Sequence, residues 1–190
     1  MESCFYTART EPRLCAMEYI YFSRPDSRID GRSVHEMRKQ TGRRLAEQDK
    51  GRLQADLVIG VPDSSLPAAI GYSEASGLPY ELGLIKNRYV GRTFIKPNQA
   101  QRDLSVRMKL SADRAVIAGK RIVLVDDSVV RGTTSKRTIR LLKNAGAAEV
   151  HLRIASPRVL FPCFYGVDTS TREELISARL SEQDLCREQE

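Results

Sequence analysis

The sequence predicts a single α/β domain in which a mainly parallel sheet is flanked by helices. Two short apolar runs, Leu57–Val61 and Arg121–Val125, have the form of buried strands, and each is followed by a polar loop and then a helical pattern. Strands that alternate with helices along the chain are typical of a parallel sheet. The length of 190 residues and the hydrophobic content of 41% suit one such domain with a sizeable core.

The first elements of the chain are a predicted strand and a predicted helix. Residues Glu18–Phe22 are β-branched and aromatic, and the turn-forming segment Ser23–Ser27 follows them, which predicts a strand and then a turn. Residues Ser33–Glu36 have the form of a capping box. Apolar or small side chains recur at helical spacing after it, at Val34, Met37, Thr41 and Leu45, so we expect a helix of about four turns.

The two apolar runs each open a strand–loop–helix unit. The first continues through the polar loop Pro62–Ser65 into a helical stretch from Leu66 to Ser76. The second continues through the polar loop Asp126–Ser135 into a helix from Lys136 to Ala145. Both loops leave the carboxyl end of a strand, which is the edge of a parallel sheet where ligands bind.

The end of the domain contains one more strand and a short helix. Apolar residues at 150, 152 and 154 alternate with polar ones, which predicts a strand. Thr171–Glu174 can cap a final helix. We therefore divide the chain into an N-terminal extension (1–14), one domain (15–180) and a polar tail (181–190).

The positive charge of the chain is concentrated in one segment. The formal net charge is +7, and residues 86–109 combine a single acid, Asp103, with seven cations: Lys86, Arg88, Arg92, Lys96, Arg102, Arg107 and Lys109. A compact cluster of this kind fits a small polyanion at least as well as a nucleic acid duplex, because a duplex reader usually spreads its charge along a broad face or a recognition helix. The alternative is a solvated basic loop. No apolar run approaches a membrane span or a signal-peptide core, so we expect a cytoplasmic protein.

The most informative stretch of the sequence is Val123–Ser135. A buried strand delivers Asp126 and Asp127 at its tip, where carboxylates can accept hydrogen bonds from a vicinal diol or hold Mg²⁺, which favours oxygen ligands. Gly132 then permits a tight turn, and three hydroxyl residues open the next helix, whose N-terminal N–H groups suit a phosphate. A solvated turn and ordinary capping would explain each part alone, but the combination predicts a site for a ribose 5-phosphate.

These residues resemble the phosphoribosylpyrophosphate (PRPP) motif of type I phosphoribosyltransferases. Four further stretches make the chain similar to the amidophosphoribosyltransferase family, a resemblance that runs from about Cys15 to about Ile176: residues 15–27, 61–64, 86–94 and 162–168. The resemblance implies the type I phosphoribosyltransferase fold. It also implies a reaction of PRPP with ammonia that gives 5-phosphoribosylamine and pyrophosphate at the start of purine synthesis.

The resemblance assigns roles to individual residues. It places Asp126 and Asp127 on the ribose diol and the metal, and it places Ser64 on Mg²⁺ beside Asp63 in a loop facing the pyrophosphate. Ser64 or Ser65 could equally cap the following helix. Lys86 and Arg88 belong to a loop that folds over PRPP and stabilises the leaving group. The resemblance matches Arg131, Gly132, Thr133, Thr134 and Ser135 with the 5′-phosphate loop, and it adds Ser128 to the residues expected to bind PRPP.

The sequence departs from the family in two respects. The glutaminase domain that opens a complete amidotransferase has no counterpart in these 190 residues, so we expect ammonia rather than glutamine as the nitrogen donor. Cys15 and Cys163 match two of the four ligands of an iron–sulfur cluster found in one branch of the family, and the other two are missing. We therefore expect thiols and no cluster, because a cubane needs four thiolates.

Other functions remain open at this point. A PRPP-sensing regulator or inactive homologue would keep the ribose phosphate loop but would not need the basic segment 86–109 or the Ser64 loop. A salvage phosphoribosyltransferase would need a base pocket after the strand at 147–155, and residues 162–166 fit the amidotransferase better. The small-molecule partners that we expect are PRPP and ammonia, and the sequence also leaves a homo-oligomer open.

Overall fold

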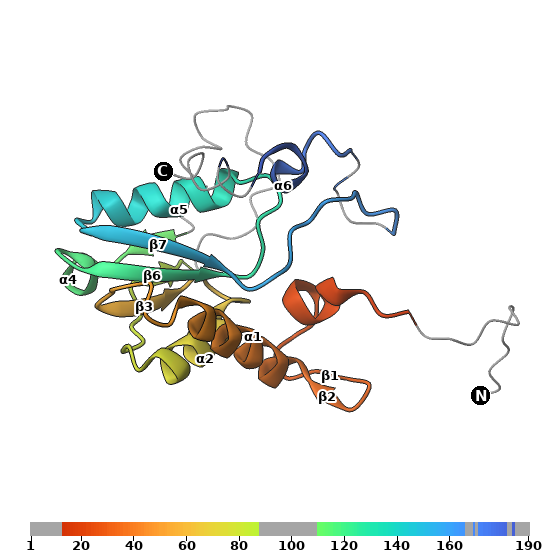
Figure 1. Cartoon of the computed structure of the whole chain (residues 1–190), viewed down its shortest axis with the longest axis horizontal. Coiled ribbons are helices and arrows are strands. Elements are labelled where there is room, and N and C mark those ends of the chain that lie inside the picture. The colour runs from red at the N-terminus through yellow and green to blue at the C-terminus, as the bar shows by residue number, and fades with distance from the viewer. Residues whose placement is uncertain (1–12, 88–109, 166–168, 170, 182–183, 185–190) are drawn as a thin grey trace, which may run out of the picture.

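The centre of the fold is a parallel sheet of three strands. The computed structural model describes residues 13–87, 110–165, 169, 171–181 and 184. Strand β6 (Arg121–Asp126) lies between β3 (Leu57–Gly60) and β7 (Glu149–Ile154), and all three run in the same direction (Figure 1). Each strand was predicted within one or two residues of these bounds, so the α/β fold with a parallel sheet is confirmed.

Helices cover both faces of this sheet. Helices α1 (Val34–Asp49) and α2 (Leu66–Ser76) lie on one side, and α5 (Thr133–Asn144) lies on the other (Figure 1). Alternate strand residues point to opposite faces. The α5 face buries one set of apolar side chains, Leu57, Ile59, Ile122, Leu124, Ile139 and Leu142. The α2 face buries another, Val58, Ala68, Ala69, Tyr72, Val123 and Val125.

Helices α1 and α2, which lie on the same side of the sheet, pack with their backbones in close contact. A Cβ atom at Gly42 of α1 would lie 1.8 Å from the carbonyl oxygen of Ala68, and one at Gly71 of α2 would lie 2.0 Å from that of Lys39. Glycine is required at both positions for this reason. Because α2 follows directly on the loop after β3, the crossing also determines where that loop lies.

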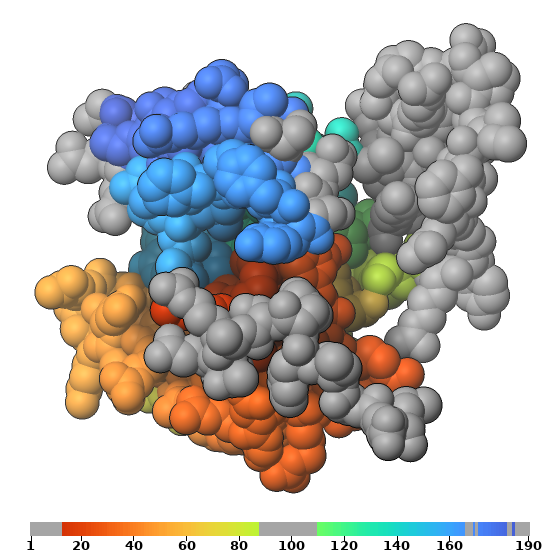
Figure 2. Space-filling model, turned by 90° about the vertical axis from the view of Figure 1, so that its right-hand side faces the viewer, coloured from red at the N-terminus to blue at the C-terminus, as the bar shows by residue number. Residues whose placement is uncertain are grey.

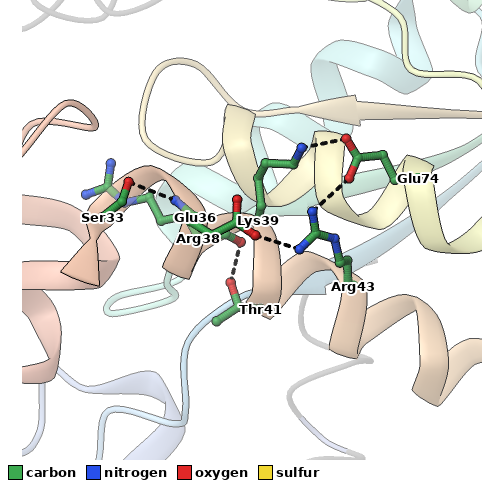
Figure 3. A network of polar contacts seen from close by, with 7 residues as sticks. All are labelled: Ser33, Glu36, Arg38, Lys39, Thr41, Arg43 and Glu74. Carbon is green, nitrogen blue, oxygen red and sulfur yellow. Dashed lines mark hydrogen bonds and ion pairs between the residues drawn. The ribbon is translucent and has the colours of Figure 1, made fainter. Parts of the chain in front are cut away.

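An exposed network of ion pairs accompanies the helix crossing (Figure 3). The Glu74 carboxylate of α2 forms ion pairs with Lys39 at 2.5 Å and with Arg43 at 3.1 Å. Arg43 also forms an ion pair with Glu36 at 2.7 Å. At the start of α1, the Glu36 N–H donates to Ser33 Oγ at 3.3 Å, which confirms the predicted N-cap. Surface pairs of this kind contribute little each, so the glycine contact dominates the packing of α1 on α2.

Two antiparallel strand pairs and two short helices complete the described fold. Strands β1 (Arg28–Ile29) and β2 (Arg32–Ser33) form a hairpin before α1, and β4 (Leu84–Lys86) pairs with β5 (Leu110–Ala112). Helix α4 (Arg114–Ile117) follows β5, and α6 (Ile176–Arg179) lies near the C-terminus. In the described part of the chain, no helix is long and apolar enough to cross a bilayer.

The β4–β5 pair was not predicted, and its register matters for the site. Lys86 lies opposite Leu110, so the two ends of the intervening segment are held side by side. Most of the predicted basic segment, including Arg88, lies outside the described residues. The chain therefore leaves and rejoins the described fold at neighbouring positions.

The expected strand at Glu18–Phe22 is wrong, because these residues form a single π-helical turn, η1. The Ser23 N–H donates to the Glu18 carbonyl at 3.1 Å, and a buried arginine, Arg38, binds the carbonyls of Tyr19 and Ser23. The Tyr19 and Ser23 carbonyls therefore accept hydrogen bonds from the Arg38 side chain, and not from a neighbouring strand. Strand propensity is overridden by tertiary context of this kind.

The expected capping box at Thr171–Glu174 is also wrong. Helix α6 begins only at Ile176, and its N-cap, Leu175, has no capping side chain. Glu174 forms an ion pair with Arg131 instead, and the Ile176 N–H donates to the Val130 carbonyl at 2.9 Å. Tertiary contacts with the loop after β6 thus take the place of local capping. In the space-filling view, blue residues from the C-terminal part lie above red and orange residues from the N-terminal part on this side of the molecule (Figure 2).

Candidate active site

Two adjoining cavities lie at the carboxyl ends of β3 and β6. The first encloses about 330 Å³ and is bounded by Tyr21, by the loop after β3 and by the whole of residues 126–135. The second encloses about 380 Å³ and shares Tyr21, Pro62 and Ser64 with the first. Its other lining residues are Phe22, Ser23, Pro25, Arg38, Asp63 and Lys86. The predicted site residues that the structure describes are therefore brought together around one continuous depression.

A buried pair of carboxylates lies between the cavities. Asp126 and Asp127 are 7% and 8% exposed. Ser64 Oγ donates to Asp127 Oδ2, and Ser128 Oγ donates to Asp127 Oδ1 at 2.8 Å. Ser65 Oγ donates to Asp126 Oδ1 at 3.2 Å, and the Asp127 N–H donates to the same oxygen at 2.9 Å. Both serine hydroxyls thus bind carboxylates and neither caps helix α2, while the expected role of Ser64 on Mg²⁺ stays a prediction.

Asp126 is affected by its burial and by its charged neighbour. Burial raises the pKa of Asp126 to about 6, and the neighbouring charge of Asp127 acts in the same direction. Two adjacent carboxylates are unfavourable when both are ionised and buried, and a cation relieves that cost. The pair is therefore a place where a positive ion is stabilised at neutral pH.

The donor set fits a hard divalent cation. The oxygen atoms of Asp126, Asp127 and Ser64 meet at the cavity, and Asp126 Oδ2 accepts no hydrogen bond from the described part of the chain. Among the described residues, no group of three or more His, Cys, Asp or Glu side chains could hold a metal by itself. Mg²⁺ commonly binds one or two carboxylates and completes its shell with water and substrate phosphates, so the residues present suit Mg²⁺.

The loop after the carboxylates ends in a helix N-terminus that faces the first cavity. Gly132 occupies the N-cap of α5 with φ 78°, a left-handed conformation that favours glycine. It has no side chain to cap the helix, and Ser135 Oγ donates back to the Gly132 carbonyl at 3.1 Å. Thr133 and Thr134 are exposed. The helix begins three residues earlier than predicted, which brings its first N–H groups to the cavity that they line.

Arg131 lies at the rim of the first cavity. Its guanidinium forms an ion pair with Glu174 at 2.5 Å, and its side chain is 46% exposed. The sequence placed Arg131 on the phosphate loop, and the structure shows that this loop is tied through Arg131 and Val130 to the segment before α6. The C-terminal part of the domain thus supports the loop.

The basic side of the site is more open than the carboxylate side. Lys86 forms an ion pair with Asp63 across the second cavity, and the two side chains are 49% and 63% exposed. The peptide bond between Pro62 and Asp63 is cis. The ion pair places Lys86 beside the loop that carries Ser64, and its expected role on the diphosphate stays a prediction.

Three residues that line or support the site were missed by the sequence reasoning. Arg38 is 4% exposed on the inner face of α1, Tyr21 borders both cavities, and Ser65 binds Asp126. Arg38 could have been found, because it continues the four-residue spacing of Val34, Gly42 and Ala46, which are the buried positions of α1. A lone arginine in such a register indicates a buried charge with a specific partner.

The two cysteines that matched cluster ligands, Cys15 and Cys163, form no disulfide in the described part of the chain. Cys15 is exposed and Cys163 is half-buried, and the Cys163 N–H donates to Thr169 Oγ1 at 3.3 Å. Cys4 and Cys186 lie outside the described residues, as do Gly166 and Asp168 of the predicted motif. The absence of an iron–sulfur cluster stays a prediction.

The fold and this arrangement define a class of protein. Residues 33–155 match the family model described as the phosphoribosyl transferase domain, and the chain belongs to that family. The match covers β3, β6 and β7 together with the loops that line the first cavity.

Within this family, the chain is most informatively compared with relatives named amidophosphoribosyltransferase. The chain is 59% identical to the amidophosphoribosyltransferase of Bacillus subtilis over 99% of its own length and 53% identical to that of Synechococcus elongatus over 97%. It is also similar to a solved structure of glutamine PRPP amidotransferase from B. subtilis complexed with ADP and GMP, with a TM-score of 0.82 and 62% identity. That match covers 92% of this chain and 38% of the solved one. The chain spans about two fifths of the length of these relatives and corresponds to their phosphoribosyltransferase part.

Proposed function

We propose that this chain binds PRPP with Mg²⁺ and transfers ammonia to C1, giving 5-phosphoribosylamine and pyrophosphate in purine biosynthesis. The observation that carries the proposal is the loop after β6. It presents two buried carboxylates and an uncapped helix N-terminus to one cavity of about 330 Å³. The names of the relatives point to the same reaction.

The ligand can be assigned to the site in three parts. The 5′-phosphate would lie at the start of α5, where Gly132 lets the backbone approach and Thr133, Thr134 and Ser135 supply N–H groups and hydroxyls. The ribose diol would lie against Asp126 and Asp127. The diphosphate would then extend toward Ser64 and the second cavity, where Lys86 and Arg38 supply positive charge.

The residues of the chain do their work by positioning and by charge. Mg²⁺ bound at the carboxylates would neutralise charge on the departing diphosphate. Lys86 can exchange its partner Asp63 for the diphosphate, because an exposed ion pair is weak and its loss costs little. No side chain has to act as the nucleophile, since ammonia brings its own lone pair to C1. Holding C1 and the leaving group in place is then the main contribution of the protein.

The test is pyrophosphate release by the purified 190-residue chain with PRPP and Mg²⁺. We expect release that depends on ammonium and rises with pH at fixed total ammonium, because only neutral ammonia has a free lone pair. Parallel reactions contain glutamine, adenine or guanine in place of ammonium. We expect these to remain at the background of PRPP hydrolysis.

Each alternative function has its own outcome in this assay. PRPP binding without pyrophosphate release under any condition would favour a PRPP-sensing protein. Release that requires adenine or guanine would favour a salvage enzyme. Release with glutamine alone, at a rate comparable to that with ammonium, would contradict the expected nitrogen donor. Absence of both PRPP binding and turnover would contradict the proposal as a whole.

A further inference from the structure

Arg38 is a buried cation that lines the second cavity and also binds the N-terminal turn η1. It projects from the first turns of α1 and is 4% exposed. Nε donates to the Tyr19 carbonyl at 2.6 Å and Nη2 donates to the Ser23 carbonyl at 2.9 Å. Tyr19 lies near the start of the π-helical turn η1 (Glu18–Phe22), and Ser23 is the C-cap at its end. One guanidinium therefore clamps the whole turn.

The clamped turn forms a wall of the site. Tyr21, which lies between the two clamped carbonyls in sequence, lines both cavities, and Phe22 and Ser23 line the second. Tyr21 and Phe22 are 54% and 43% exposed, so their own packing does little to fix them. Arg38 therefore holds the turn together with the Tyr19 hydroxyl, which donates to the Ile29 carbonyl at 2.9 Å.

Arg38 also acts on the carboxylate pair through its charge. It lines the second cavity together with Ser64, whose hydroxyl binds Asp127. Burial lowers the pKa of Arg38, and the charge of Asp127 opposes that effect, so the two groups interact electrostatically. The other two site cations of the described chain, Lys86 and Arg131, form ion pairs with Asp63 and Glu174 instead.

We propose that Arg38 is a positioning residue of this site, which fixes the Tyr19–Ser23 turn against the ligand and places a permanent buried positive charge near Asp127. The first effect keeps the wall closed around an anionic ligand. The positive charge of Arg38 weakens the binding of a bare cation to the carboxylates. The same charge reduces the repulsion between the carboxylates and an anionic ligand. The identity of that ligand as PRPP rests on the proposed function, but the clamp itself does not.

The two effects can be separated by two substitutions. Arg38→Lys keeps the charge but replaces a planar fork with a single ammonium, which cannot reproduce two donors in fixed directions. Arg38→Met keeps an unbranched side chain and removes the charge. Arg44→Met, at an exposed position of the same helix, is the matched control.

The first readout is the binding of Mn²⁺ alone, measured by electron paramagnetic resonance with Mn²⁺ as a probe for the carboxylate pair. We expect Arg38→Met to bind Mn²⁺ roughly threefold to tenfold more tightly than the parent, because a nearby positive charge has been removed. Arg38→Lys and Arg44→Met should stay within about twofold of the parent. A loss of fold alone would weaken Mn²⁺ binding and would not strengthen it.

The second readout is the mobility of the turn. The chain contains no tryptophan, so Tyr21→Trp introduces a single reporter on η1. In this background we expect acrylamide to quench the reporter more strongly in both Arg38→Lys and Arg38→Met than in Arg44→Met. The affinity for PRPP with Mg²⁺, measured by calorimetry, should fall at least about tenfold in both variants.

The outcomes distinguish the two proposals. A parent protein that binds Mn²⁺ but not PRPP contradicts the proposed function, while Mn²⁺ affinity and quenching still decide the role of Arg38. If Arg38→Met does not fold, quenching and PRPP affinity in Arg38→Lys decide it. Unchanged quenching in Arg38→Lys overturns the clamp, and an unchanged or weaker Mn²⁺ affinity in a folded Arg38→Met overturns the electrostatic role.

Discussion

The two halves of the site are built in opposite ways. The half that follows β6 is buried: Asp126 and Asp127 are less than a tenth exposed, and their oxygens receive hydrogen bonds from three serine hydroxyls and a backbone N–H. The half formed by Asp63 and Lys86 is about half exposed and is joined by one ion pair. The first half is preorganised by its own hydrogen bonds, whereas the second can change partners at low cost.

The largest change in the free energy of unfolding is expected when the contact between α1 and α2 is disturbed, because this contact supports the loop that carries Ser64 and Ser65. Gly71→Ala places a methyl group 2.0 Å from the Lys39 carbonyl, so α2 must move away from α1 and carry Ser64 and Ser65 with it. We expect a loss of about 3–5 kcal/mol in the free energy of unfolding, measured by urea denaturation.

The control for that substitution is Ala75→Ser on the exposed side of α2, which should change the free energy by less than about 0.5 kcal/mol. A Gly71→Ala variant within 1 kcal/mol of the parent, on the scale of ordinary mutational effects, would show that the helices can separate freely. The loop after β3 would then be independent of the helix crossing.

The next effect comes from removing the charge of the buried half. Asp126→Asn combined with Asp127→Asn keeps shape and polarity but removes the negative charge that suits Mg²⁺. We expect Mg²⁺-dependent PRPP affinity to fall by about a hundredfold or more, which corresponds to about 3 kcal/mol, in calorimetric titrations. The Asp113→Asn variant, which alters the half-buried N-cap of α4 outside the site, is the control. Unchanged affinity in the double variant would remove both carboxylates from the proposed site.

A pH dependence of stability should distinguish the two halves as well. The pKa of Asp126 is raised to about 6 in the folded state, so its contribution to stability is greatest below its unfolded pKa near 4 and is lost as the pH rises through 6. Between pH 4 and 7 in EDTA, the stability gained by Asp126→Asn over the parent should grow by up to about 3 kcal/mol. A difference that is constant with pH would show that the folded carboxyl titrates normally.

The smallest effect is expected in the exposed half. Lys86→Met or Asp63→Asn breaks only an exposed ion pair, so each should change the free energy of unfolding by less than about 1 kcal/mol. Lys86→Met should nevertheless slow pyrophosphate release by about tenfold or more, because charge on the leaving group is then less stabilised. A large loss of stability, or unchanged turnover, would contradict the division of the site into a structural half and an exchangeable half.

The sequence predicted the buried half better than its surroundings. Asp126, Asp127 and Gly132 follow a strand and precede a helix, so local pattern alone brings them together, and the strand–loop–helix units formed as expected. Residues Glu18–Phe22 carry a strand-like pattern but form η1, because their acceptors bind Arg38 from another element. The β4–β5 pair joins residues separated by more than twenty positions without a local signal, and its pairing depends on tertiary structure.

The pairing of Lys86 with Leu110 has a further consequence for how this domain can change over time. Forming the ladder that joins the two ends of this connection costs loop-closure entropy on folding, and that cost grows slowly with the length of the connection. Each doubling of its length then adds only about 0.6 kcal/mol. The length of the sequence between these strands can therefore change by recombination at little cost to the paired strands, so the sequence of this segment and the stability of the fold can evolve separately.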